Sequence, residues 1–346
     1  MIIIGSYNSV KFLIREKISK TDFSGEEAVI ESVGMSDAYQ FPILGGSLLV
    51  FLYVLVKYFG KGVVNSFLIC YFVFVGMESF KAILNNYTSF GKIKQDSKEN
   101  NFKTPILFKN VSIMGMDLSI SKFDLVALLC SAVCGVIYVM TNHWTMNNLL
   151  GILFTLFALE NMFLGDFKVG AVLLGGLFFY DIFFVFGTDV METVAKSIDG
   201  PIKLLFPKNV IVEKSSDLSL LGLGDIIIPG VFIALCLRYD FIRNFDPKTK
   251  TRDYDSVLNL FASINKPYFW SCIIGYVIGI LVTVAVMLVF KRGQPALLYL
   301  VPGCLLSVLL CAFVRKEVQA IYKYNEDEEI KAIYDQTKAL AANKDE

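Results

Sequence analysis

Long apolar blocks alternate with short charged segments along most of the chain. Eight of these blocks have close to the length of about 20 residues that an α-helix needs to cross a hydrocarbon core of about 30 Å. The eight blocks are, approximately, Phe41–Phe59, Val63–Leu84, Phe123–Met140, Asn148–Leu164, Val169–Thr188, Leu218–Leu237, Tyr268–Phe290 and Pro295–Val314. Backbone groups find no hydrogen-bond partner in lipid, so each block is expected to be a helix. The pattern predicts an all-α polytopic membrane protein with eight transmembrane helices.

The same pattern divides the chain into three parts. Residues 1–40 form a mixed-charge N-terminal segment, residues 41–314 a transmembrane domain, and residues 315–346 a charged C-terminal tail. In the tail, the acidic run Glu326–Glu329 is expected to be a solvated face or a disordered end. Polar residues interrupt Met1–Ile14, so this stretch lacks the pattern of a secretory signal peptide.

Composition and charge agree with a membrane protein. The chain of 346 residues is 55% hydrophobic and 18% charged, whereas soluble domains are typically about 25% charged. The formal net charge is zero, which argues against a nucleic-acid partner. All seven cysteines lie inside apolar blocks, which predicts buried thiols rather than a disulfide framework.

Lys and Arg are distributed unevenly between the two sides of the predicted membrane domain. With eight spans both termini share one side, and most of the 32 Lys and Arg residues fall on that side. Because cytosolic loops carry the excess of positive charge, both termini are expected in the cytosol. This orientation places the loop Asp189–Asp217, between the fifth and sixth spans, on the lumenal or outer face.

Two aspartates lie deep inside neighbouring spans. Asp181 is surrounded by apolar residues apart from Tyr180, and it lies seven residues before Thr188, where the fifth span ends. Asp225 lies seven residues after Leu218, where the sixth span begins. At the helical rise both carboxyl groups are about 10 Å from the same face. An ionisable group in a span costs about 2.5–3.5 kcal/mol on insertion scales, so both are candidates for function.

Two further acidic residues lie in predicted spans, Glu78 and Glu160. Each is near the cytosolic end of its span, and Glu78 also lies close to Lys81 in the sequence. Long side chains at helix ends reach the interface, so we interpret both as span termini in contact with water.

The residues around Asp225 favour an irregular and accessible backbone. Gly222 and Gly224 precede it, and glycine both allows close approach of helices in membranes and weakens a helix locally. Pro229 follows four residues later and removes one helix hydrogen bond, which favours a kink. These properties suit a site where a second carboxyl group and a substrate backbone must come near Asp225.

A pair of carboxyl groups within a few Å of each other in a low-dielectric site cannot both ionise, so they share one proton. The ionised partner can take a proton from a water molecule while the protonated partner donates to a scissile carbonyl oxygen. This is the chemistry of aspartic proteases. The sequence does not assign the two roles between Asp181 and Asp225.

A third motif lies at the start of the last span, in the segment Gln294-Pro295-Ala296-Leu297. Proline is tolerated where a helix begins, and the residue before it is pushed toward extended geometry. This segment is therefore either a plain helix start or an irregular backbone that lines protein or water.

These motifs resemble those of a known family. Tyr180-Asp181, Gly222-Leu223-Gly224-Asp225 and Pro295-Ala296-Leu297 match, in order, the three signatures of the Gly-x-Gly-Asp intramembrane aspartyl proteases. Within that group the chain closely resembles the signal peptide peptidases, from about residue 41 to 316. The resemblance implies a presenilin-like fold and a catalytic pair formed by the two aspartates. The remaining motif residues then have supporting roles: Tyr180, Gly222, Leu223 and Gly224 shape the site, and Gln294, Pro295, Ala296 and Leu297 support it and the substrate.

The resemblance also implies a cellular setting. Signal peptide peptidases reside in the endoplasmic reticulum membrane and cut residual signal peptides and other membrane segments whose N-termini face the cytosol. They need no metal or other cofactor, often form homo-oligomers and take part in degradation of membrane proteins. Members have nine spans, so the resemblance implies that the eight predicted here correspond to the second through ninth, and no counterpart of the first is expected in Met1–Gln40.

Presenilins share the three signatures, but their catalytic loop is cytosolic and they depend on partner subunits. The lumenal loop predicted here favours a signal peptide peptidase over a presenilin-type protease subunit. The sequons at Asn86 and Asn110 fall in a loop predicted to be cytosolic, so neither is expected to carry a glycan.

Two other classes of function remain open from the residues alone. Paired intramembrane carboxyl groups also serve as relays in proton-coupled transporters and channels, and the chain could be a substrate-holding member of a degradation complex. A zinc protease needs a His-Glu-x-x-His motif, which the single histidine, His143, cannot supply. A serine protease of the membrane needs a buried histidine, and His143 is expected in a loop.

Overall fold

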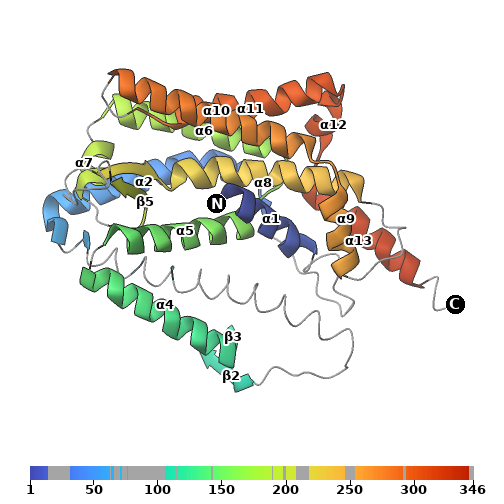
Figure 1. The fold of residues 1–346 in the computed structure, drawn as a ribbon, viewed down its shortest axis with the longest axis horizontal. Coiled ribbons are helices and arrows are strands. Elements are labelled where there is room, and N and C mark those ends of the chain that lie inside the picture. Colours follow the sequence, from blue (N-terminus) through green and yellow to red (C-terminus); the bar gives the residue numbers. More distant parts are fainter. Residues whose placement is uncertain are drawn as a thin grey trace. The chain divides into compact units, whose positions relative to one another are not determined.

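The computed structural model describes most of the chain. It covers residues 1–14, 32–62, 64–65, 71, 76, 106–113, 116–141, 143–188, 190–197, 200–207, 218–245, 254–290 and 294–342. Most of these residues are helical (Figure 1), which confirms the predominantly helical class. Four of the described helices are long and apolar enough to cross a membrane: α2 (Met35–Phe59), α6 (Phe167–Phe186), α10 (Pro267–Phe290) and α11 (Leu297–Val314).

Most of the predicted spans coincide with helices to within a few residues. The third and fourth spans correspond to α4 (Lys122–Thr141) and α5 (Trp144–Asn161). The second span, Val63–Leu84, lies almost entirely outside the described residues, so the count of eight spans stays a prediction. Five further described helices were not predicted: α1 (Ile2–Leu13), α7 (Val190–Ser197), α9 (Tyr254–Ser263), α12 (Val318–Lys323) and α13 (Glu326–Ala342).

The predicted sixth span, Leu218–Leu237, is wrong at its start. The chain forms strand β6 (Leu218–Gly222) there, and helix α8 begins only at Gly224 and continues to Asn244. Strand β6 pairs antiparallel with β5 (Lys203–Pro207), which satisfies its backbone groups without a helix. A short apolar run such as Leu218–Leu221 does not distinguish a strand from a helix by periodicity. Asp225 consequently lies in the first turn of α8 instead of two turns inside a helix.

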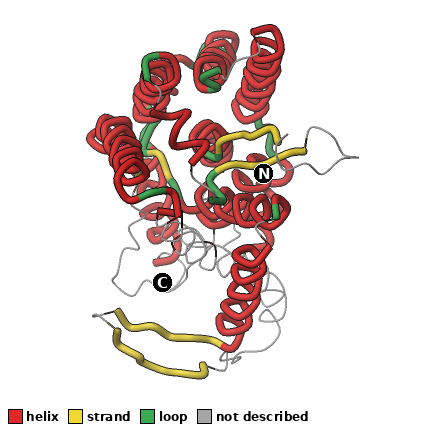
Figure 2. Tube along the Cα trace, turned by 90° about the vertical axis from the view of Figure 1, so that its left-hand side faces the viewer, coloured by secondary structure: helices red, strands yellow, loops and turns green. Residues whose placement is uncertain are grey.

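Two more strand pairs make the all-α description incomplete (Figure 2). Strand β1 (Ser32–Val33) pairs parallel with β4 (Phe163–Leu164), and β2 (Ile106–Ile113) pairs antiparallel with β3 (Met116–Ser121). The sequon at Asn110 lies in β2, whereas Asn86 lies outside the described residues.

The chain forms two compact units. Unit 1 comprises residues 1–58, 158–197 and 224–346, and unit 2 comprises residues 59–157 and 198–223. Helix α8 is the centre of unit 1, because it contacts α1 (Ile2–Leu13), α6, α10, α11 and α13 (Glu326–Ala342). Every residue of α8 from Pro229 to Ile242 is buried. A helix that is buried on all faces occupies a core.

Helix α1 packs on α8, and each of the two helices has a glycine against Leu159 of α5. A side chain at Gly5 of α1 or at Gly230 of α8 would meet Leu159 at 2.6 or 2.7 Å, so Leu159 fits between two glycines. Glu160, predicted to reach water, is only 3% exposed. Lys11 of α1 lies within electrostatic range of this carboxyl group.

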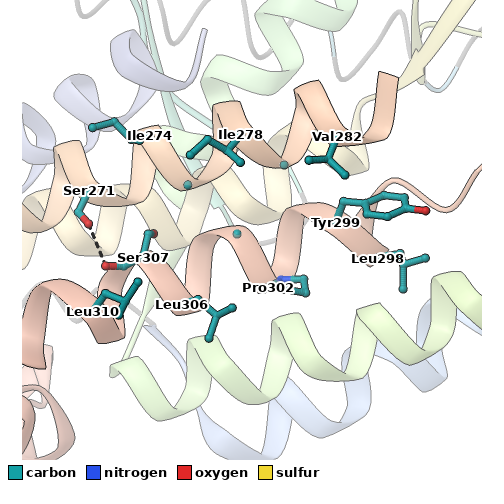
Figure 3. A pocket seen from close by; sticks show the side chains of 13 residues that line it. Ser271, Ile274, Ile278, Val282, Leu298, Tyr299, Pro302, Leu306, Ser307 and Leu310 are labelled. Atoms are coloured by element: carbon teal, nitrogen blue, oxygen red, sulfur yellow. Dashed lines mark hydrogen bonds between the residues drawn. The ribbon is translucent and has the colours of Figure 1, made fainter. Parts of the chain in front are cut away.

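Helices α10 and α11 approach each other closely at three glycines. A Cβ atom at Gly275 would lie 2.2 Å from the carbonyl oxygen of Gly303, and one at Gly279 would lie 3.0 Å from the backbone of α11. An apolar groove of about 500 Å³ lies along the two helices beside these glycines (Figure 3). Inside it the Ser271 hydroxyl donates to the carbonyl oxygen of Ser307 at 2.8 Å. Close packing of this kind fixes the position of α11 on α10.

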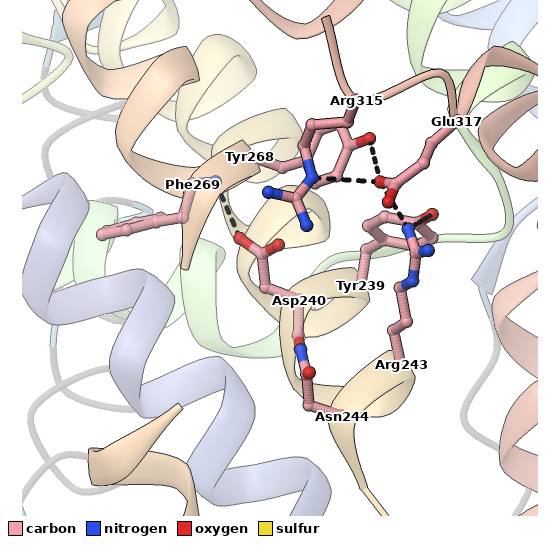
Figure 4. A network of polar contacts seen from close by, with 8 residues as sticks. All are labelled: Tyr239, Asp240, Arg243, Asn244, Tyr268, Phe269, Arg315 and Glu317. Atoms are coloured by element: carbon pink, nitrogen blue, oxygen red, sulfur yellow. Dashed lines mark hydrogen bonds and ion pairs between the residues drawn. The ribbon is translucent and has the colours of Figure 1, made fainter. Parts of the chain in front are cut away.

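At the other end of the same helices, Glu317 joins α8, α10 and the end of α11 (Figure 4). Its carboxylate accepts hydrogen bonds from the Tyr268 hydroxyl at 2.7 Å and from the Arg315 guanidinium at 3.1 Å. It also forms an ion pair with Arg243 of α8 at 2.5 Å. In the same region the backbone N–H of Phe269 donates to the carboxylate of the α8 residue Asp240.

The C-terminal tail is part of unit 1. Helix α12 (Val318–Lys323) and helix α13 follow α11, and α13 contacts α8. Glu326, expected to be solvated, is 1% exposed and forms two hydrogen bonds with Arg238 of α8, which is also fully buried. The prediction for the acidic run was wrong at this position, because a buried guanidinium needs a partner charge. Glu328 and Glu329 are exposed as expected.

Candidate active site

Asp181 lies in the second-last turn of α6 and is 4% exposed. Asp166 begins this helix, because its carboxylate accepts a hydrogen bond from the N–H of Val169 and caps the first turn. The carboxylate oxygen Oδ2 of Asp181 accepts a hydrogen bond of 3.0 Å from the backbone N–H of Leu297. A group from the last transmembrane helix therefore holds the Asp181 side chain.

The segment from Gln294 to Leu297 explains why this N–H group is available. Helix α11 begins at Leu297, with Ala296 as its N-cap residue and Pro295 just before it. The first N–H groups of a helix have no partner within the helix, so the N–H of Leu297 can donate to Asp181. The positive end of the helix dipole also favours a negative charge there. Gln294 is half-buried at the start of the segment.

Asp225 lies in the first turn of α8 and is partly exposed. Its carboxyl group lies close enough to that of Asp181 for the two charges to repel each other. Both carboxyl groups are thus near the N-terminus of a helix, α11 for Asp181 and α8 for Asp225. Two helix N-termini can stabilise the one negative charge that the pair carries when it shares a proton.

The two glycines predicted to shape the site, Gly222 and Gly224, lie in different surroundings from each other. Gly224 is exposed, and among the described residues a Cβ atom there would meet only Ile228, at 3.9 Å. Among the described residues, no other helix closely approaches Gly224, and its exposed position lies beside Asp225. Gly222 pairs with Lys203 at the end of β6.

Leu223 and Tyr180 are held by packing. Leu223 is buried, and its N–H donates to the carbonyl oxygen of Ile202 at 3.0 Å. The Tyr180 ring stacks on that of Phe184 with 4.7 Å between centroids. It also lies against α2, where a Cβ atom at Gly46 would meet it at 3.7 Å. Tyr180 therefore forms part of the packing between α6 and α2.

Comparison with known proteins identifies the family. Residues 25–328 match the family model described as signal peptide peptidase, which is most of the chain. The chain belongs to the signal peptide peptidase family. This family consists of intramembrane aspartyl proteases of the Gly-x-Gly-Asp type, which are hydrolases.

Several relatives support this membership. The chain is 37% identical over 302 residues to the signal peptide peptidase of Mus musculus, which covers 86% of this chain and 74% of the mouse protein. The identity to the Homo sapiens signal peptide peptidase is 36% with the same coverage. It is 40% over 239 residues to intramembrane protease 2 of Caenorhabditis elegans, which covers 68% of this chain and 48% of the worm protein.

One residue at this candidate site was not found from the sequence. The hydroxyl group of Tyr276, on α10, lies 3.4 Å from the backbone carbonyl oxygen of Asp225 and donates to it. Its ring is 7% exposed. A tyrosine in an apolar span does not attract attention in a sequence, and its partner is a backbone group, so no pattern of side chains could have predicted this contact.

Proposed function

We propose that the chain is an intramembrane aspartyl endopeptidase in which Asp181 and Asp225 are the catalytic pair. The observation that carries the proposal is that these two carboxyl groups, from separate helices of one unit, lie within electrostatic range of each other. Membership of the signal peptide peptidase family supports it.

The proposed reaction is hydrolysis by an activated water molecule. One aspartate is ionised and takes a proton from the water, whose oxygen attacks the carbonyl carbon of the peptide bond. The protonated aspartate donates to the carbonyl oxygen, which gives a tetrahedral intermediate. Collapse of this intermediate breaks the C–N bond as the protonated carboxyl group of the pair gives its proton to the leaving amine. A hydroxyl group of the intermediate gives its proton to the other carboxylate as the new carbonyl group forms. The products are a new carboxyl terminus and a new amino terminus, and the pair again holds one proton.

The surroundings of the pair fit this chemistry. The N–H of Leu297 binds Asp181 in a fixed position, which favours orientation of the reacting groups before the reaction begins. The open space at Gly224 leaves room for a peptide backbone beside Asp225. Because two helix N-termini supply the positive potential, the shared negative charge needs no cation from a side chain.

We propose residual signal peptides and other membrane segments with cytosolic N-termini as substrates, in the endoplasmic reticulum membrane. The names of the mouse and human relatives support this choice. Both termini of the chain then face the cytosol, and the loop Asp189–Asp217 faces the lumen. The lipid bilayer surrounds the protein, and a homo-oligomer and factors of membrane-protein degradation are proposed as partners. Glycan found at Asn86 or Asn110 would overturn this orientation.

The decisive experiment uses variants of the two aspartates. Purified wild type, Asp181→Asn and Asp225→Ala are incubated in detergent with a labelled signal peptide, and product is quantified by mass spectrometry. Each variant should lose at least about 1,000-fold of the cleavage rate, and the double variant should be no worse than a single one, since the pair acts as a unit. Asp335→Asn is a matched control, because Asp335 is exposed on α13. Wild-type cleavage by either active-site variant would disprove the proposal.

A proton relay is the second candidate, because the same pair of intramembrane carboxyl groups would serve it. The same variants reconstituted in liposomes separate the two functions. A proton flux that the wild type supports and Asp225→Ala abolishes, without any peptide cleavage by the wild type, would favour transport.

A further inference from the structure

The carbonyl group of Asp225 has lost its usual helix partner. In an α-helix this oxygen accepts a hydrogen bond from the N–H of the residue four positions later. That residue is Pro229, which has no N–H, and a proline ring also displaces the carbonyl group four residues before it. Helix α8 nevertheless continues through Pro229, which is buried. Asp225 is partly buried, and a carbonyl group there without a partner destabilises the structure, so a replacement donor is expected.

The Tyr276 hydroxyl group is in the position of that donor. It lies 3.4 Å from the carbonyl oxygen of Asp225, and it is held there by a buried ring on α10, a helix that packs along α8. This distance is long for a hydroxyl donor, and such bonds at reactive sites often tighten when substrate binds. The hydroxyl group is also within electrostatic range of the Asp225 carboxyl group.

We propose that Tyr276 is a positioning residue for Asp225, and that its hydroxyl group replaces the backbone N–H that Pro229 lacks. The first turn of α8 is then fixed by α10 rather than by its own helix ladder. This arrangement keeps the backbone beside Gly224 and Asp225 open while it holds the orientation of the carboxyl group. The inference rests on the proposed role of Asp225 in catalysis.

A double-variant cycle of Tyr276 and Pro229 tests the inference. Tyr276→Phe removes only the hydroxyl group, and it should lower kcat by up to about tenfold with little change in KM, because the loss is one hydrogen bond that orients a catalytic group. Pro229→Ala restores an N–H donor to the Asp225 carbonyl group. In that background Tyr276→Phe should have little further effect on kcat, so the two changes should be strongly non-additive. Tyr322→Phe is the control, because Tyr322 is exposed on α12.

The same four proteins are also compared by thermal unfolding in detergent, which does not require activity. Tyr276→Phe should lower Tm in the protein with Pro229 and leave it nearly unchanged in the protein with Ala at that position. The inference is overturned if Tyr276→Phe lowers kcat equally in the Pro229 and the Pro229→Ala backgrounds. If Pro229→Ala is inactive, the same comparison is made on Tm, and equal effects there also overturn it. A wild-type kcat for Tyr276→Phe would do the same. If Asp225→Ala cleaves normally, the proposed function itself fails, which is a separate result.

Discussion

Leu297 and Gly224 contribute to the aspartate site through their backbones rather than their side chains. The N–H of Leu297 binds Asp181, and the missing side chain of Gly224 leaves space beside Asp225. Pro229 also acts through the backbone, because it has no N–H and leaves the carbonyl group of Asp225 without its usual helix donor. Substitutions at these positions therefore change the orientation of the aspartates or the access of substrate to them, whereas substitutions of the aspartates remove a reacting group.

Lys316 offers a test of backbone strain at a single residue. It has a positive φ of 58° and follows the last residues of α11, where the N–H of Glu317 binds the carbonyl oxygen of Ala312. Glycine adopts this left-handed conformation at a helix end without a steric penalty. Lys316→Gly should therefore raise the free energy of unfolding by about 0.5–1 kcal/mol, measured as a higher Tm in detergent. The matched control, Lys331→Gly inside α13, should lower stability by about 1 kcal/mol. A loss of stability at Lys316 would contradict the strain argument.

The candidate residues were predictable from the sequence where a polar group interrupts an apolar block. Asp181 and Asp225 stand out in this way, because an ionisable group within a membrane span costs free energy and is usually retained for function. Tyr276 does not stand out, and neither does the contact of Leu297 with Asp181, because backbone partners leave no signature in side-chain chemistry.

At the scale of whole elements, the length of an apolar block predicts a helix well. Helices α6, α10 and α11 follow the predicted spans to within two residues. This prediction fails where the backbone of an apolar block finds hydrogen-bond partners outside a helix. Strand β6 is the example, because β5 supplies its hydrogen bonds. The prediction also fails for α1, whose 12 residues are too few to be recognised as a span.

The contact between α10 and α11 can be tested at Gly275. A Cβ atom at this position would lie 2.2 Å from the carbonyl oxygen of Gly303 and 2.5 Å from the hydroxyl group of Ser307. Gly275→Ala should force the helices apart and lower the free energy of unfolding by about 1–3 kcal/mol. The control is Gly175→Ala on α6, where an added Cβ meets no atom of the described part of the chain within 4 Å. This variant should be neutral or slightly stabilising. The two variants are compared by Tm in the same detergent, and equal Tm values would refute the close contact between α10 and α11 at Gly275.

The Glu317 network predicts a pH dependence for the ends of α8, α10 and α11. Burial favours a higher pKa for the Glu317 carboxyl group, but hydrogen bonds from Tyr268, Arg243 and Arg315 outweigh burial and hold the pKa below its ordinary value. A depressed pKa means that the carboxylate stabilises the folded state above its ordinary pKa of about 4.3. This contribution is lost as the pH falls through the lower, folded value. The Tm advantage of wild type over Glu317→Gln should therefore be present at neutral pH and shrink in acid.

A control variant and the sign of the pH effect make this test specific to Glu317. Glu328→Gln, at an exposed position on α13, should show no comparable pH-dependent difference from wild type. A Tm difference between wild type and Glu317→Gln that grows on acidification would reverse the expected sign and contradict the assignment of the network.

At the scale of the whole molecule, both ends of the chain meet at Arg238 in the core of unit 1. Its guanidinium group donates to the Ser9 hydroxyl group of α1 at 2.8 Å and lies 4.4 Å from the centre of the Phe163 ring in β4. Glu326, from the C-terminal tail, completes its environment. None of this was visible in the sequence, where Arg238 follows a predicted span and Glu326 belongs to an acidic run. Which charge of such a run becomes buried depends on tertiary packing.

The buried pair predicts that the tail stabilises unit 1. Glu326→Ala leaves the guanidinium group of Arg238 buried without its counter-charge, and it should lower the free energy of unfolding by about 3–5 kcal/mol, whereas Glu329→Ala at an exposed position should have little effect. The double variant Arg238→Met with Glu326→Leu should recover most of the loss, because an apolar pair of similar volume carries no desolvation penalty. Thermal unfolding of the four proteins in detergent measures all three effects. Equal Tm values for Glu326→Ala and Glu329→Ala would mean that the tail does not depend on this pair for its place on α8.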